Sequence, residues 1–173
     1  MIQKKRLQIV GLACLLGALS LHPAISAFVA WTKVNGVYTD SSGTAIAGVA
    51  ARGIDVSHWQ QSINWDAVAA DDIQFVMLGT RYNNAADPFF QSNASKAAEA
   101  GLKVGAYIYS YATTTQMAEQ EADFVLNLIK DYPISYPVVF DVESSEMSAL
   151  SPSELSAVIN AFCKKIRDAG YYP

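Results

Sequence analysis

The chain has 173 residues, enough for one domain with a buried core, and 51% of them are hydrophobic. Its net charge is −4, which becomes −7 when the three cations at positions 4–6 are set aside. An acidic chain without a basic patch argues against nucleic acid as a partner, and more weakly against an anionic membrane surface.

The first 27 residues have the pattern of a secretory signal peptide. Three basic residues precede an apolar run at 7–21, and the small residues Ala24, Ser26 and Ala27 follow it. The apolar run is shorter than the roughly 20 residues that a membrane-spanning helix needs. We predict that residues 1–27 are a signal peptide, with an uncleaved N-terminal membrane anchor as the alternative. After cleavage only Cys163 remains, so no intrachain disulfide can form.

Residues 28–51 carry no strong helical signal. Two extended segments, 34–38 and 44–46, flank the polar sequence Asp-Ser-Ser-Gly at 40–43, which is typical of a turn. We predict a hairpin around that turn, or an extended lead-in, and assign it no function.

From Arg52 the chain alternates between short apolar strands and amphipathic helices. Asn64 is a predicted N-cap, Gly101 is placed to end a helix, and Ser-Pro-Ser-Glu at 151–154 is a capping box followed by a helix that Gly170 ends. We predict strands at 53–57, 74–78, 104–109 and 138–142, and helices at 65–70, 88–100, 113–130 and 152–169. Four strand–helix units in succession predict a parallel sheet with right-handed crossovers.

Two architectures fit this α/β pattern, an open doubly wound sheet and a β/α barrel. No glycine-rich phosphate loop follows any predicted strand, which removes the main support for a nucleotide-binding open sheet. A barrel needs further strands, and a fifth would begin at Tyr171. We therefore expect residues 52–173 to form an incomplete catalytic domain with only the first four strand–helix units of a barrel.

The strongest chemical signal is the pair Asp141 and Glu143 at the end of the fourth predicted strand. Alternate side chains of a strand share a face, so we expect both carboxylates on one face, with Phe140 and Val142 on the other. Repulsion between neighbouring carboxylates raises one pKa, which keeps a general acid protonated near neutral pH. The alternative is a solvated acidic strand end, since Glu146 follows closely.

Asp55 occupies a similar place in the first predicted strand. It could cap the following turn, which is a common role of aspartate. If the strands belong to a barrel, Asp55 meets Asp141 and Glu143 at the mouth where such barrels keep their catalytic groups. Three converging carboxylates with aromatic neighbours suit glycoside hydrolysis.

A metal site is not expected, because His58 has no Cys or His partner at ligand spacing. Several aromatic side chains follow the predicted strands or lie within them. Each could stack on a sugar ring, although a place in the core is the expectation for any one of them: Trp59, Tyr107, Tyr109 and Tyr111.

The chain from about Gly53 to its C-terminus resembles glycoside hydrolase family 25, the Chalaropsis-type muramidases. The resemblance rests on motifs that occur in order: Gly-Ile-Asp-Val-Ser-His-Trp-Gln at 53–60, Ile-Asn-Trp at 63–65, the spaced set Asp87, Phe90, Asn93, Ala97 and 100–102, Val-Gly-Ala-Tyr at 104–107, Glu121-Ala122, and Asp-Val-Glu at 141–143 after Tyr136-Pro137. Several motifs in register make a chance similarity improbable.

This resemblance implies a β/α barrel of the family 25 lysozyme type. It implies hydrolysis of the β-1,4 bond between N-acetylmuramic acid and N-acetylglucosamine in bacterial peptidoglycan. Glu143 would be the general acid, with Asp141 and Asp55 in support, and either the substrate's N-acetyl group or a carboxylate would be the nucleophile. No cofactor is implied, and we expect a secreted monomer associated with the cell wall.

The sequence departs from the family pattern in three places. Many relatives carry a basic residue where Gly79 stands; Arg81, two residues on, could replace it on the same face, and with Tyr107 and Tyr109 it forms the predicted substrate-binding set. Many relatives also have His where Ile108 stands, which predicts the loss of a polar group from the mouth. The family domain continues beyond the present C-terminus. A non-catalytic glycan-binding module or an inactive fragment is therefore the alternative.

Overall fold

The computed structural model describes residues 31–173, so the predicted signal peptide lies outside the described residues. The chain divides into two compact units, and the boundary in the sequence falls between Ala50 and Ala51. Within residues 31–173, no helix combines the length and the apolar character that crossing a bilayer requires.

The first unit contains a β-hairpin that was not predicted, and it precedes the predicted turn at 40–43. Strands β1 (Trp31–Val34) and β2 (Val37–Asp40) pair antiparallel. Asn35 and Gly36 join them with φ angles of 52° and 82°, the left-handed pair that an Asn-Gly hairpin turn requires. The prediction overlooked this two-residue signal in favour of the longer polar segment that follows.

The polar segment at 40–43 forms a second turn. Asp40 Oδ1 accepts hydrogen bonds from the backbone amides of Ser42 and Thr44, at 2.8 and 2.9 Å. The side-chain hydrogen bond from Ser42, followed by the other bonds of the turn, lowers the pKa of Asp40. An isolated bridge between Thr39 and Ala45 closes the turn.

The second unit is built on a four-stranded parallel sheet, as predicted. Its strand order follows the chain, β3-β4-β7-β8. The strands are β3 (Gly53–Val56), β4 (Phe75–Gly79), β7 (Lys103–Tyr109) and β8 (Ile134–Asp141). A short antiparallel hairpin that was not predicted, β5 (Arg81–Tyr82) and β6 (Ala85–Ala86), follows β4.

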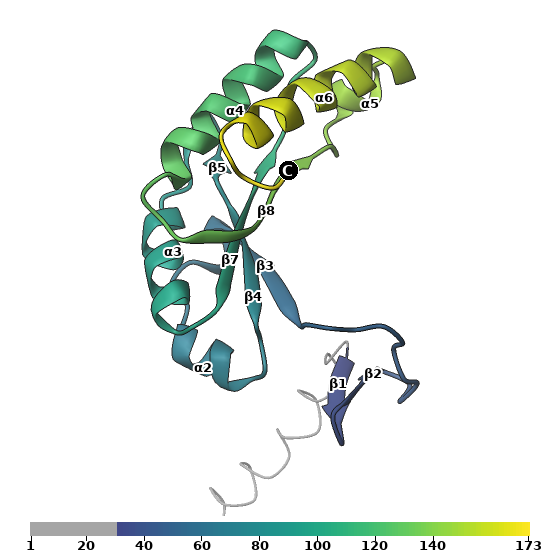
Figure 1. The fold of residues 1–173 in the computed structure, drawn as a ribbon, viewed down its shortest axis with the longest axis vertical. Helices are drawn as coiled ribbons and strands as arrows, with labels where there is room; N and C mark the ends of the chain where they lie inside the picture. The colour runs from purple at the N-terminus through teal and green to yellow at the C-terminus, as the bar shows by residue number, and fades with distance from the viewer. Residues whose placement is uncertain (1–30) are drawn as a thin grey trace, which may run out of the picture. The chain divides into compact units, whose positions relative to one another are not determined.

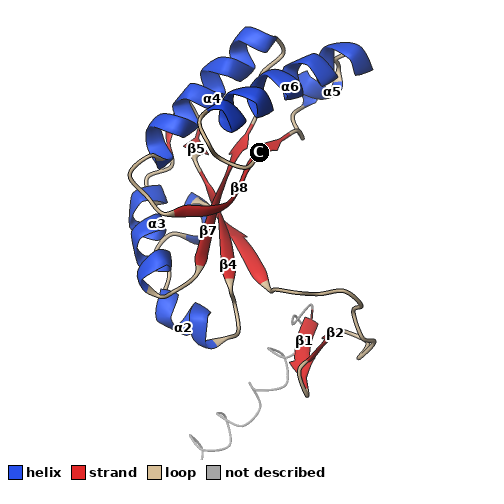
Figure 2. Cartoon of the chain, in the orientation of Figure 1, coloured by secondary structure: helices blue, strands red, loops and turns tan. Residues whose placement is uncertain are grey.

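Within residues 31–173, the connecting helices cover one face of this sheet and none of them covers the other (Figures 1 and 2). They are α2 (Trp65–Ala70), α3 (Phe90–Glu99), α4 (Thr115–Ile129) and α6 (Pro152–Asp168). Two short helical turns, η2 (His58–Gln60) and α5 (Ser145–Ser148), follow β3 and β8. The predicted helices agree with these bounds to within two residues.

The predicted helix ends are confirmed by their hydrogen bonds and backbone angles. Asn64 Oδ1 accepts from the amide of Ala67 at 3.1 Å, which caps α2. Ser151 and Glu154 form both halves of the capping box of α6. Gly101 and Gly170 have φ angles of 86° and 89°, the left-handed geometry that favours glycine after a helix.

Strand β8 begins four residues earlier than predicted. Pro137 lies inside it, and proline is unusual within a strand because it lacks the amide hydrogen for the ladder. The register between β7 and β8 shifts between Val104 and Ala106, close to this proline. Val138 donates its amide to the carbonyl of Tyr172 at 2.8 Å, so the end of the described chain lies along β8.

Alternate residues of the strands serve two different faces, as the pleat of a sheet requires. The helix-facing residues are apolar and buried: Val56, Val76, Leu78, Val104, Ala106, Ile108 and Val138. The residues between them, which include Asp55, Tyr107 and Asp141, point to the opposite face.

Candidate active site

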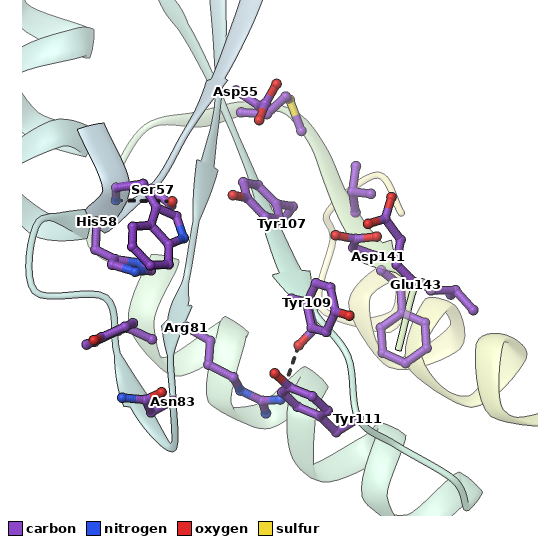
Figure 3. A pocket seen from close by; sticks show the side chains of 16 residues that line it. Asp55, Ser57, His58, Arg81, Asn83, Tyr107, Tyr109, Tyr111, Asp141 and Glu143 are labelled. Atoms are coloured by element: carbon purple, nitrogen blue, oxygen red, sulfur yellow. Dashed lines mark hydrogen bonds between the residues drawn. The ribbon is translucent and has the colours of Figure 1, made fainter. Parts of the chain in front are cut away.

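A cavity of about 930 Å³ lies on the sheet face that the helices leave free (Figure 3). It extends to the carboxyl ends of the strands, where parallel β/α folds place their functional groups. Its lining residues come from all four strands and from the segments that follow them: Asp55, Ser57, His58, Trp59, Met77, Arg81, Tyr82, Asn83, Tyr107, Tyr109, Tyr111, Val139, Phe140, Asp141, Val142 and Glu143.

The two outer strands of the sheet and the segment that follows β8 supply the three predicted acids. Asp55 lies in β3, and Asp141 is the last residue of β8, opposite Tyr109 of β7. Glu143 lies two residues beyond the end of β8 and lines the same cavity (Figure 3). The structure therefore brings together the three carboxylates that the sequence indicated.

The alternation predicted from Phe140 to Glu143 agrees with the structure. Asp141 and Glu143 line the cavity, whereas Phe140 and Val142 pack against the buried core, although both also border the cavity. Phe140 stacks on Phe162 of α6, with ring centroids 4.3 Å apart.

Asp141 has a raised pKa, as expected for one member of an acidic cluster. Partial burial is the largest cause, and the negative charges of Glu143 and Asp55 act in the same direction. The three acids are thus electrostatically coupled, although loss of water contributes more than repulsion does.

Tyr107 lies between the acids of the two outer strands (Figure 3). Burial raises the pKa of its hydroxyl group and the nearby aspartates add to the effect, while a hydrogen bond with Ser57 opposes it. Gly79 makes room for this ring, because a Cβ atom there would lie 2.9 Å from Ser57 Cβ and 3.0 Å from the Tyr107 oxygen. A larger residue at 79 would displace the tyrosine.

Asp87 and His58 fix the start of η2 beside the cavity. Asp87 is 3% exposed, and its Oδ2 accepts the backbone amide of His58 at 2.6 Å. The same oxygen lies 3.5 Å from His58 Nδ1. Within residues 31–173 there is no group of three or more His, Cys, Asp or Glu side chains that could hold a metal ion.

Residues 54–173 match the sequence pattern of the family described as Glycosyl hydrolases family 25. The chain belongs to glycosyl hydrolase family 25. This match covers every strand of the parallel sheet and the segments that carry the three acids.

Two curated proteins are similar to this family 25 chain. Over 126 residues it is 32% identical to the uncharacterized protein YegX of Escherichia coli K12, an alignment that covers 69% of the chain and 45% of YegX. It is 33% identical to lysozyme M1 of Streptomyces globisporus, over 64% of the chain and 40% of that protein. The chain therefore spans less than half the length of these two relatives.

Solved structures of family 25 lysozymes share the fold. The lysozymes of Streptomyces coelicolor and Aspergillus fumigatus are 26% and 28% identical to the chain, with TM-scores of 0.54 and 0.55. The matches cover 70% and 69% of the chain, and 59% and 60% of those proteins. The modular autolysin LytC of Streptococcus pneumoniae, solved with a synthetic peptidoglycan ligand, is similar with a TM-score of 0.69. This match covers 83% of the chain and 36% of the LytC chain. Because the two sequences are 24% identical, the match supports the fold alone. The four-stranded sheet thus corresponds to part of the family 25 barrel.

Arg81 of this family 25 chain lines the cavity, so the structure brings the predicted set Arg81, Tyr107 and Tyr109 together. It lies in β5, outside the parallel sheet, so its face does not follow from that of Gly79. Its Nη1 donates to Glu121 Oε1 at 2.6 Å and to the carbonyl of Tyr109 at 3.3 Å. The positive charge is therefore already neutralised inside the protein.

Glu121 of α4 lies outside the cavity lining but holds residues that border it, a role that was not predicted from the sequence. It is 7% exposed, and besides Arg81 it accepts the hydroxyl of Ser110 at 2.6 Å and the amide of Tyr111 at 3.2 Å. The sequence did contain a signal for this role. Glu121 is a charged residue within the apolar stripe of a helix, and a charged residue that is buried must have polar or charged partners.

Two expectations about side-chain direction were wrong. Ile108 is fully buried on the helix side of β7, so this position does not affect the polarity of the cavity mouth. Trp59 and Tyr111 do not fill the core: they are 76% and 46% exposed, and both line the cavity. Tyr107 and Tyr109 are intermediate in exposure.

Proposed function

We propose that this chain is the catalytic region of a muramidase that hydrolyses the β-1,4 bond between N-acetylmuramic acid and N-acetylglucosamine in peptidoglycan. The observation that supports this proposal most directly is that one cavity is lined by three carboxylates and two tyrosines: Asp55, Asp141, Glu143, Tyr107 and Tyr109. Lysozyme M1, which is 33% identical, and LytC with its synthetic peptidoglycan ligand support this class of substrate.

In the proposed reaction Glu143 protonates the glycosidic oxygen as the bond to the leaving sugar breaks. Positive charge then develops on the sugar ring, where nearby carboxylates stabilise it. Asp141 and Asp55 approach the same cavity from β8 and β3, which suits them to this supporting role. The nucleophile is either the substrate's own N-acetyl group or one of these carboxylates.

The tyrosines suit a neutral sugar ligand, because aromatic faces pack against sugar rings while hydroxyl groups bind polar substituents. Because the pKa of Asp141 is raised, this carboxyl group stays partly protonated at a higher pH than an ordinary aspartate does. We propose that the protein acts outside the cell on the bacterial wall, in line with the signal-peptide pattern of residues 1–27.

The proposal is tested by replacing Glu143 with Gln and measuring the clearing of cell-wall suspensions and the release of reducing ends. Loss of a general acid is expected to lower the rate by about 100- to 10,000-fold. Glu146→Gln is the matched control, because this exposed glutamate lies outside the cavity lining and should retain wild-type activity.

Wild-type activity in Glu143→Gln would show that another group is the acid. Retention of the wild-type chain on peptidoglycan without release of reducing ends would favour the alternative function, a non-catalytic glycan-binding module.

A further inference from the structure

Asp87 is a buried carboxylate that the proposed reaction does not use. It is 3% exposed and lies outside the cavity lining. Its Oδ1 accepts the amide of Phe89, two residues further on, at 2.8 Å, which fixes the direction of the carboxylate. Its Oδ2 accepts the amide of His58, 29 positions earlier, at 2.6 Å. The carboxylate therefore fastens the start of η2 to the segment that precedes α3.

The turn η2 connects this carboxylate to the hydroxyl group of Tyr107. Ser57, the N-cap of η2, directly precedes His58, and its side chain is hydrogen-bonded with the Tyr107 hydroxyl. Gln60 Oε1 accepts the amide of Ser57 at 2.8 Å, which closes the capping box of the turn. Since the turn is closed within itself, the hydrogen bond from His58 to Asp87 helps to set where Ser57 lies.

A second path from Asp87 reaches the main chain of Tyr107. The amide of Asp87 donates to the carbonyl of Thr80 at 3.0 Å. The amide and the hydroxyl of Thr80 both donate to the carbonyl of Tyr107, each at 2.9 Å. Tyr107 is therefore connected to Asp87 at both ends, at its main chain through Thr80 and at its hydroxyl through Ser57. A change of the Asp87 side chain leaves the main-chain path in place.

Tyr107 lies where such control affects chemistry. The negative charges of Asp55 and Asp141 both act on its hydroxyl group. Figure 3 shows the ring between the strands that carry these two acids. A displacement of about 1 Å in a group that contacts the reacting atoms can lower an enzymatic rate by about 100-fold. The position of the Tyr107 hydroxyl should therefore matter for the rate of hydrolysis.

We propose that Asp87 is a positioning residue, which acts through Ser57 to hold the Tyr107 hydroxyl between the acids of the cavity. This inference rests on the proposed function. A carboxylate is needed because both of its oxygens accept backbone N–H groups, whereas an amide side chain has one acceptor oxygen. In Asp87→Asn the amide –NH₂ group would face the N–H of either His58 or Phe89, so one of the two contacts is lost.

The test is a double-mutant cycle of Asp87→Asn and Tyr107→Phe in the full chain, measured as kcat/KM for the release of reducing ends from cell walls. Each single change is expected to lower kcat/KM by about tenfold. The double variant should also lose about tenfold, and not about 100-fold, because Asp87 acts on the hydroxyl that Tyr107→Phe removes. Asp66→Asn, at an exposed position outside the cavity lining, is the matched control and should retain wild-type activity.

A second readout does not depend on activity. The nuclear Overhauser effect between the Tyr107 ring and the Ser57 side chain should be present in the wild type and in Asp66→Asn, and lost in Asp87→Asn. Asp87→Ala, which removes both acceptor oxygens, is the second variant and should lose the same signal. A thermal melt of each variant limits the comparison to chains that retain the fold.

A loss of about 100-fold in the double variant would overturn the positioning role, because the two residues would then act independently. A Tyr107–Ser57 signal that persists in the folded Asp87 variants would overturn it as well. A wild-type chain that releases no reducing ends, combined with a Tyr107–Ser57 signal that depends on Asp87, would refute the hydrolase and support the positioning of Tyr107.

Discussion

Glu121 and Arg81 form an ion pair that joins helix α4 to the β5–β6 hairpin, with 2.6 Å between Oε1 and Nη1. Both side chains are largely buried, at 8% and 17% exposed. The same carboxylate holds Ser110 and Tyr111 at the end of β7. One buried glutamate therefore fixes two segments that line the cavity.

Glu121→Ala is expected to lower the free energy of unfolding by about 3 kcal/mol, because it leaves a buried guanidinium without its partner. The double variant Glu121→Leu/Arg81→Met should lose less than this, since it removes both charges together. Urea unfolding of both variants measures the difference. Glu119→Ala, at an exposed position on the same helix, is the control. An equal loss in the single and double variants would show that the ion pair is not the cause.

Asp141→Asn is expected to stabilise the folded protein at neutral pH while impairing hydrolysis. The folded state raises the pKa of Asp141 above its usual 3.8, so the folded protein binds this proton more tightly than the unfolded chain does. Ionisation of Asp141 therefore costs stability as the pH rises above 3.8. The melting temperature of the variant should be about 1–3 °C higher than that of the wild type at pH 7. At about pH 3 the two melting temperatures should be equal.

Thermal melts between these two pH values test the effect of Asp141. Asp131→Asn, at an exposed position outside the cavity lining, is the control. A stabilisation that is the same at both pH values would rule out the carboxyl pKa as its origin.

Gly79→Ala is expected to destabilise the protein by about 1–3 kcal/mol through overpacking. The added methyl group would lie 3.0 Å from the Tyr107 oxygen and 2.9 Å from Ser57 Cβ, so the ring must move. The cost should be smaller in a Tyr107→Ala background, where part of the obstruction is absent. Chemical unfolding of all four combinations gives the coupling, and a coupling near zero would mean that the ring does not limit position 79.

Local chemistry explains which parts of this fold the sequence could predict. Asn64, Gly101 and Ser151 act through hydrogen bonds or backbone angles within a few residues, and each was identified at the right helix end. Strand alternation also carried the prediction that Asp141 and Glu143 face one side. The same alternation predicts that Ile108 points to the helix side, where it is buried. The expectation that it lies at the mouth came instead from the histidine that many relatives carry at this position.

The parts that could not be predicted depend on contacts between distant segments. Glu121 and Arg81 lie 40 positions apart, and nothing in either neighbourhood specifies the other. The β5–β6 hairpin has strands of two residues, too short for a hydrophobic period to develop. Tryptophan is a residue type that often fills a core, and the 76% exposure of Trp59 within residues 31–173 depends on the arrangement of neighbouring elements.

Ser151→Ala tests whether the capping box stabilises the helix that lies beside the acid-bearing strand. Ser151 Oγ accepts the amide of Glu154, while the Glu154 carboxylate accepts the Ser151 amide at 2.9 Å. The side-chain hydrogen bond from Ser151 lowers the pKa of Glu154, so the carboxylate is ionised over a wide pH range. Loss of an N-cap serine costs about 1 kcal/mol.

Ser156→Ala, at an exposed position inside the same helix, should be neutral or slightly stabilising because alanine is the better helix former. Helix α6 packs against α4 and β8 through Phe162 and Ile166, so the loss should appear in global unfolding by urea. If instead only the first turn of α6 gains hydrogen exchange while the unfolding midpoint stays constant, the cap stabilises the helix end alone.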